Sequence, residues 1–150
     1  MRVFNTNKVE ETLKLAKKLG NLINKGSVIL LDGDLGAGKT TFTKGLAEAL
    51  GIKKNISSPT FTILKTYFIN ENYTFNHLDL YRLDNALSDF DLKEYIDDRL
   101  STTVIEWPFN VADFLPNEYL LITIKYIDET KREFIFEPIG EYYERVVSQL

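Results

Sequence analysis

The chain has 150 residues, enough for a single domain over residues 1–150 with a hydrophobic core of its own. It contains no cysteine, which excludes disulfides and thiolate metal sites, and its apolar stretches fall short of the roughly 20 residues of a membrane-spanning helix. The net charge of −4 excludes a general basic surface for nucleic acids, and the first residues lack the apolar region of a signal peptide, so we expect a soluble, cytoplasmic protein.

The first third of the chain predicts a helix, a strand and a second helix. Apolar residues at intervals of three and four predict a helix over residues 6–23, with Asn7 as its N-cap and Glu10 as the capping partner. The β-rich run at 27–31 is typical of a buried strand. Residues 38–50 predict the second helix.

The remaining chain predicts more strands than helices. In order, the expected elements are strands over 61–68 and 73–81 with a turn at 70–72, a helix over 87–100 capped by Ser88 or Asp89, a buried strand over 102–107, a hairpin of strands over 118–127 and 132–138, and a helix over 141–150. Strand–loop–helix units mixed with hairpins predict an α/β domain whose sheet is partly antiparallel.

A glycine-rich loop between the first strand and the second helix matches the template G-x-x-x-x-G-K-[ST] at every fixed position. The loop consists of Gly33, Asp34, Leu35, Gly36, Ala37, Gly38, Lys39 and Thr40. Its glycines allow successive backbone N–H groups to point at phosphate oxygens, and the following helix adds its positive end. We expect Lys39 to bind the β- and γ-phosphates, the Thr40 hydroxyl to bind Mg²⁺, and Thr41 to contact the α-phosphate.

The loop therefore predicts binding of a nucleoside triphosphate, and a glycine-rich turn without a ligand is the alternative. Guanine-specific proteins usually carry an Asn-Lys-x-Asp signature downstream of the loop, and this sequence has none there. ATP is the expected nucleotide.

Two later strands carry candidate carboxylates. Glu106 ends an apolar strand, where ligands bind in open α/β sheets, and it is a candidate for orienting Mg²⁺ or water; an exposed strand-end carboxylate is the alternative. His77, Asp79 and Tyr81 alternate with leucines and are expected on one face of their strand, where Asp79 could reach the metal. The only histidine, His77, is either a site residue or a hydrogen-bonded structural residue.

A serine- and threonine-rich loop at 57–62 follows the phosphate-binding helix. A hydroxyl such as that of Thr60 is suited to sensing the γ-phosphate, so that the loop changes with nucleotide state. Alternatively, Ser58 and Pro59 only begin the next strand.

Four segments in this order and spacing resemble the TsaE (YjeE) family: GDLGAGKTTFTKGL, SPTFT, HLDLYRL and IEWP. The resemblance implies a small P-loop NTPase-like, three-layer α/β fold with a central mixed parallel and antiparallel sheet. It also implies a slow ATPase that supports a complex of TsaD and TsaB. That complex transfers a threonylcarbamoyl group to the adenosine beside the anticodon of tRNAs that read codons beginning with A, and ATP turnover resets it between cycles.

The resemblance also implies roles for individual residues. Lys39, Thr40 and Thr41 hold phosphates and Mg²⁺, and Thr60 belongs to a switch-like loop. The carboxylates identified above, at positions 79 and 106, act near the metal and the attacking water. Trp107 is a candidate for contact with nucleotide or partner, and a core or rim aromatic is the other interpretation. The last residues, from position 138 on, match no motif of the family.

Two other functions use the same phosphate-binding loop. A small-molecule kinase usually has an arginine-bearing lid, whereas the arginines downstream of the loop are far apart in this sequence. A non-hydrolysing module would bind ATP and a partner without useful turnover, and the two carboxylates argue against it.

Overall fold

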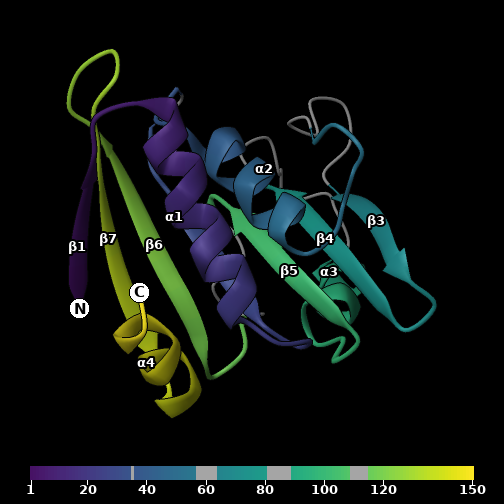
Figure 1. Ribbon diagram of the computed structural model, residues 1–150. Helices are drawn as coiled ribbons and strands as arrows, with labels where there is room; N and C mark the ends of the chain where they lie inside the picture. Colours follow the sequence, from purple (N-terminus) through teal and green to yellow (C-terminus); the bar gives the residue numbers. More distant parts are fainter. Residues whose placement is uncertain (35, 57–63, 81–88, 109–114) are drawn as a thin grey trace.

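The computed structural model describes residues 1–34, 36–56, 64–80, 89–108 and 115–150. In chain order the elements are β1 (Arg2–Thr6), α1 (Val9–Leu22), β2 (Val28–Asp32), α2 (Lys39–Ala49), β3 (Leu64–Asn70), β4 (Tyr73–Asp79), α3 (Asp89–Ile96), β5 (Ser101–Glu106), β6 (Tyr119–Tyr126), β7 (Arg132–Ile139) and α4 (Glu141–Ser148). Among these elements, the N-terminal half alternates strands with helices up to α2, and strands follow one another at β3–β4 and at β5–β6–β7 (Figure 1).

The described strands form one seven-stranded sheet in the order β1-β7-β6-β2-β5-β4-β3. The central strands β6, β2, β5 and β4 run parallel to one another, while the pairs β1–β7, β6–β7 and β3–β4 are antiparallel. The mixed sheet that the sequence predicts is therefore confirmed. In the register of the sheet Glu106 lies between Asp79 and Leu31, so the carboxyl ends of β4, β5 and β2 meet at one edge.

Helices cover both faces of the sheet and produce three layers. Figure 1 shows α1 and α2 side by side in front of the sheet and α3 behind it. The larger core lies between the sheet and α1, α2 and α4, and a smaller core packs α3 against the other face. Ile29 and Leu31 of β2 belong to the larger core, while Val28 and Leu30 belong to the smaller one. The apolar run at 27–31 is thus buried on both faces, as expected for a central parallel strand.

The two helices in front of the sheet approach each other at glycine positions. A Cβ atom on Gly20 of α1 would stand 2.6 Å from the Cβ of Ala49. One on Gly45 of α2 would stand 2.8 Å from the Cβ of Ala16. Since both distances are far below ordinary van der Waals contact, α1 and α2 pack with almost no side-chain volume between their backbones at these points.

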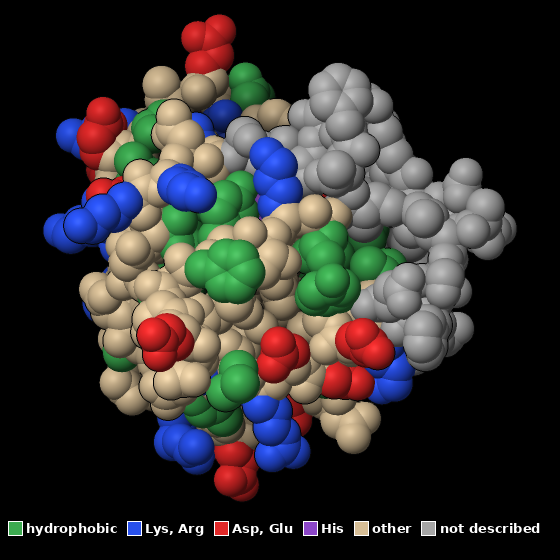
Figure 2. All heavy atoms as spheres, turned by 90° about the vertical axis from the view of Figure 1, so that its right-hand side faces the viewer, with side chains coloured by type: hydrophobic (Ala, Val, Ile, Leu, Met, Phe, Trp, Pro, Cys, Tyr) green, Lys and Arg blue, Asp and Glu red, His purple; other side chains and the backbone are tan. Residues whose placement is uncertain are grey.

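Strand β3 forms one edge of the sheet and presents a large hydrophobic side chain to solvent. Phe68 on this strand is 80% exposed. Figure 2 views the molecule from the side on which β3 lies in Figure 1, and the hydrophobic side chains on this face lie among charged ones of both signs.

Differences from the predicted elements are concentrated at the N-terminus. Strand β1 is not predicted from the sequence; it is a five-residue edge strand that is mostly exposed and pairs with β7. The predicted cap of α1 is wrong: Lys8 is the N-cap and makes no side-chain cap bond. Because the helix begins at Val9, Glu11 rather than Glu10 takes the third position, and it accepts a 2.7 Å hydrogen bond from the backbone N–H of Asn7.

Parts of three predicted elements, at 61–63, 81 and 87–88, lie outside the described residues. Among the helices of the described ranges, none is long and apolar enough to cross a membrane.

Candidate functional site

The glycine-rich loop joins β2 to α2, and positive φ angles at three glycines set its path. Gly33, Gly36 and Gly38 have φ angles of 156°, 81° and 106°. A Cβ atom on Gly33 would stand 2.6 Å from the carbonyl oxygen of Ile124 on β6, so no side chain fits there. Gly38 is the N-cap of α2, and the loop therefore leads directly into the positive end of that helix. The predicted site residue Leu35 lies outside the described residues.

The Lys39 side chain folds back over the loop. Its ammonium donates hydrogen bonds to the carbonyl oxygens of Gly33, at 2.5 Å, and Asp34, at 3.0 Å, and it lies 4.1 Å from the ring centre of Trp107. Burial lowers the pKa of Lys39 below its ordinary value of 10.5, while nearby carboxylates, with Glu106 the strongest, act in the opposite direction. The loop thus holds one partly desolvated cation, which interacts more strongly with an anion than a fully hydrated cation does.

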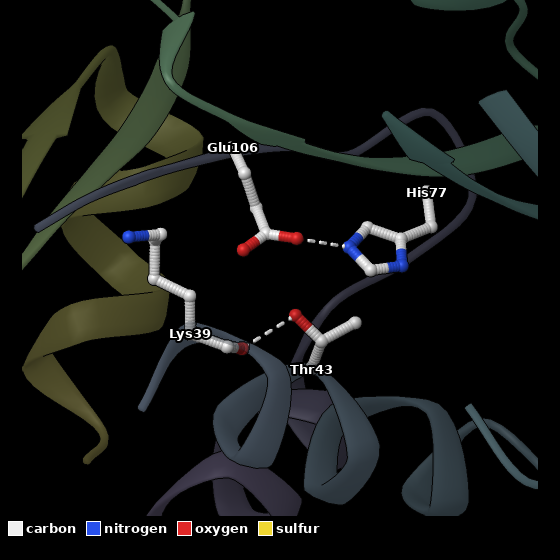
Figure 3. Close-up of polar contacts among 4 residues, drawn as sticks. All are labelled: Lys39, Thr43, His77 and Glu106. Carbon is white, nitrogen blue, oxygen red and sulfur yellow. Dashed lines mark hydrogen bonds and ion pairs between the residues drawn. The ribbon is translucent and has the colours of Figure 1, made fainter. Parts of the chain in front are cut away.

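The two predicted carboxylates, Asp79 and Glu106, end β4 and β5 and are direct neighbours in the sheet register. Glu106 is only 2% exposed, and its Oε2 accepts a 2.5 Å hydrogen bond from Nε2 of His77 (Figure 3). Leu78 and Leu80 pack in the smaller core. The predicted alternation along β4 is therefore confirmed within the described residues, and His77 lies on the α2 side of the sheet together with the carboxylate that it binds.

A cavity of about 300 Å³ brings the predicted residues together. Its lining comes from the loop, α2, the ends of β4 and β5, and β7: Gly36, Gly38, Lys39, Thr40, Thr41, Asp79, Glu106, Trp107 and Arg132. All of these except Arg132 are residues that the sequence analysis singles out. The predicted residues Gly33, Asp34 and Ala37 shape the loop without lining the cavity.

The oxygen atoms at this cavity fit Mg²⁺ bound together with a nucleotide. In such sites Mg²⁺ is held by one or two carboxylates, by phosphate oxygens and by water rather than by a complete protein cage. The Asp79 and Glu106 carboxylates and the Thr40 hydroxyl supply oxygen donors of this kind. Within the described ranges, no group of three or more His, Asp and Glu side chains could hold a metal ion by itself.

Arg132, the first residue of β7, is a cavity residue that sequence reasoning misses. Its Nε donates a 2.9 Å hydrogen bond to the carbonyl oxygen of Ala37 in the glycine-rich loop, and Nη1 donates to the carbonyl oxygen of Asp128 at 2.5 Å. Its guanidinium also lies 4.5 Å from the ring centre of Tyr126. Arg132 therefore ties the β6–β7 hairpin to the loop. No local sequence signal indicates this contact, because 95 positions separate Arg132 from Ala37.

Trp107 directly follows β5 and has a φ angle of 60°, which is uncommon for a residue other than glycine. Its ring lines the cavity, faces the Lys39 ammonium and packs against the smaller core. The packing agrees with a core or rim aromatic, while contact of this ring with nucleotide or a partner stays a prediction. The predicted residues Thr60 and Tyr81 lie outside the described residues.

The glycine-rich loop follows a central parallel strand and opens a helix, and carboxylates end the two strands β5 and β4 beside it. This arrangement defines an α/β protein with a P-loop-type fold. The family model of "Threonylcarbamoyl adenosine biosynthesis protein TsaE" matches residues 6–134. The chain belongs to the TsaE family.

Individual relatives are similar over most of their length. A Bacillus subtilis protein named tRNA threonylcarbamoyladenosine biosynthesis protein TsaE is 42% identical over 142 residues, which cover 94% of this chain and 88% of the relative. A Treponema pallidum protein of the same name is 39% identical, over 83% of this chain and 91% of the relative. The crystal structure of Bacillus subtilis YdiB matches with a TM-score of 0.81 and 36% identity, over 99% of this chain and 92% of that one.

Proposed function

We propose that the chain binds ATP with Mg²⁺ and hydrolyses it slowly, in support of threonylcarbamoyladenosine formation on tRNA. The observation that carries the proposal is the cavity in which Lys39, Thr40, Asp79 and Glu106 meet beside the glycine-rich loop. Membership of the TsaE family supports the role in this modification, since the relatives from Bacillus subtilis and Treponema pallidum are named for it.

Nucleotide binding rests on the loop and the first turn of α2. Lys39 holds phosphate oxygens in place of the two loop carbonyls to which it donates here. The backbone N–H groups that precede and open α2 bind further phosphate oxygens. Thr40 and Asp79 would hold Mg²⁺, which neutralises charge on the phosphates when it is bound.

Hydrolysis rests on Glu106. Its Oε2 is bound to His77, and Figure 3 shows the other carboxylate oxygen, Oε1, on the side of Lys39. Oε1 can accept a hydrogen bond from a water molecule and orient it toward the γ-phosphate that Lys39 holds. As the water oxygen attacks the γ-phosphorus, the bond to the bridging oxygen of ADP breaks, and ADP and phosphate are the products.

We further propose that the partner is the complex of TsaD and TsaB, with tRNA reached through that complex in the cytoplasm. The support is the resemblance of four separate segments to the TsaE family. Slow turnover suits a protein whose ATP hydrolysis returns the complex of TsaD and TsaB to its starting state and does not phosphorylate a metabolite.

The test compares three variants of the purified protein, with and without TsaD and TsaB. Lys39→Ala is expected to lose most of its nucleotide affinity, because it removes the cation of the loop. Glu106→Gln is expected to bind ATP with Mg²⁺ nearly as well as the unmodified protein and to hydrolyse it at least tenfold more slowly. Glu144→Gln, an exposed residue of α4, is the matched control and should change neither property.

Four outcomes would contradict the proposal. Equal loss of binding in Lys39→Ala and Glu106→Gln would show that Glu106 serves the metal or the fold rather than the water. Unchanged hydrolysis and unchanged tRNA modification with Glu106→Gln would indicate a non-hydrolysing module. Transfer of the γ-phosphoryl group to a metabolite would indicate a kinase. In cells, persistence of threonylcarbamoyladenosine after depletion of this protein would overturn the assigned pathway.

A further inference from the structure

The hydrogen bond between His77 and Glu106 joins two buried polar side chains at the back of the cavity. His77 is 0% exposed and Glu106 is 2% exposed. The strands β4 and β5 are paired in parallel, with His77 beside Val104 and Asp79 beside Glu106. Both side chains point to the α2 side of the sheet, and the imidazole reaches toward the end of β5 to bind the carboxylate (Figure 3).

Because of this hydrogen bond, the two carboxylate oxygens of Glu106 have different surroundings. A carboxylate oxygen only accepts hydrogen bonds, so Nε2–H of His77 donates to Oε2 of Glu106, at 2.5 Å. Oε1 lies on the side of Lys39. A glutamate side chain has several rotatable bonds, and a bond to one oxygen restricts the direction of the other.

The imidazole makes this one polar contact within the described part of the chain. Its Nδ1 is buried there without a hydrogen-bond partner. The side chain does not line the cavity, whereas Glu106 does. A buried ring that binds only the carboxylate, and is itself shielded from the cavity, is suited to acting through that carboxylate.

We propose that His77 is a positioning residue for hydrolysis: by holding Oε2, it directs Oε1 of Glu106 toward the attacking water. This inference rests on the proposed ATPase function, and it concerns kcat rather than nucleotide binding. The imidazole takes no part in bond making or breaking. Loss of hydrogen bonds that orient metal ligands lowers activity about 10- to 100-fold, and we expect a loss of the same order for this bond to Glu106.

The experiment compares His77→Gln with His77→Asn. The amide nitrogen of glutamine reaches the position of Nε2 in histidine, whereas that of asparagine reaches the position of Nδ1. Both substitutions place a neutral amide in the same buried position, but only glutamine can donate to Glu106. We expect His77→Gln to retain at least ten times the kcat of His77→Asn, with the Kd for an ATP analogue within about threefold in both.

A second comparison separates positioning from a purely structural role. In the Glu106→Gln background, His77→Asn should lower kcat by less than about twofold, because the group through which it acts is already removed. A structural role would lower kcat by the same factor in both backgrounds. Equal kcat values for His77→Gln and His77→Asn, or equal losses in the two backgrounds, would overturn the inference.

Failure of the histidine variants to fold would still leave a test in the unmodified protein. His77 is the only histidine in the chain, so its Nε2-bound proton can be assigned in NMR spectra without ambiguity. The proton should be visible and slow to exchange, and its resonance should shift in Glu106→Gln. An unchanged resonance would refute the bond. A complete lack of ATP hydrolysis by the unmodified protein would instead refute the proposed function, whatever His77 does.

Discussion

Two glycines of the glycine-rich loop should respond very differently to the same substitution. Gly36 has a φ angle of 81°, and a Cβ atom added to it would meet nothing within 4 Å. Gly36→Ala therefore costs only the backbone strain of an L-residue in the left-handed region, about 1–2 kcal/mol. Its side chain would extend into open space, so the path of the loop should persist.

Gly33→Ala adds a collision to a similar strain. Its Cβ atom would stand 2.6 Å from the carbonyl oxygen of Ile124, and ordinary contact begins at 3.4 Å. The neighbour is backbone of a central strand and cannot rotate away, so β6 and the loop have to separate. Overpacking of this kind costs roughly 1–3 kcal/mol, which with the strain amounts to about 2–5 kcal/mol for the whole substitution.

The assay for this pair is urea unfolding followed by far-ultraviolet circular dichroism, together with the binding of a fluorescent ATP analogue. Gly33→Ala should lose more unfolding free energy than Gly36→Ala and weaken nucleotide binding at least tenfold, because the loop N–H groups are displaced. Equal losses of stability in the two variants, or a larger loss with Gly36→Ala, would refute the argument that contact with β6 sets the loop path.

Two further predictions concern the charged residues of the site. Arg132→Ala removes a charged donor from the loop carbonyl of Ala37, an interaction worth about 1.5–3 kcal/mol, so the Kd for ATP should rise about tenfold or more. The neighbouring Lys131→Ala should bind ATP like the unmodified protein. Equal affinities in the two variants would show that Arg132 does not contribute to the site. Because the folded-state pKa of Lys39 lies below 10.5, the unfolded chain binds more protons in the window just below pH 10.5, and stability gains a contribution that rises with pH there. In urea unfolding between pH 8 and about 10.5, the free energy of unfolding of the unmodified protein should show this rise, and that of Lys39→Met should lack it. An identical pH dependence of the unfolding free energy in both proteins would contradict the prediction.

The sequence predicts those parts of the site whose chemistry is local. The loop at 33–40 is recognisable because glycine, lysine and threonine occur at fixed spacing, and Glu106 because a carboxylate ends an apolar strand. The polar face of β4 follows from alternation with leucines. These features depend on residues a few positions apart, so periodicity and motif spacing are sufficient to find them.

The features of the site and the fold that the sequence does not predict depend on how the strands are ordered and paired in the sheet. Arg132 reaches the loop only because β7 pairs with β6, which in turn pairs with β2. The bond between His77 and Glu106 spans 29 positions and depends on the parallel register of β4 and β5. Strand β1 is short and largely exposed, and its pairing with β7 rather than its own pattern defines it.

The glycine contacts between α1 and α2 have a mechanical consequence. With Gly20 beside Ala49 and Gly45 beside Ala16, the two helices have no compressible layer of side chains between them at these points. The C-terminal half of α2, the helix that follows the glycine-rich loop, is therefore packed tightly against α1 and has little room to slide or tilt. For the ATPase proposed above, this leaves the ends of β4 and β5 and the β6–β7 hairpin, which Arg132 ties to the loop, as the parts of the site through which a change on nucleotide binding can spread.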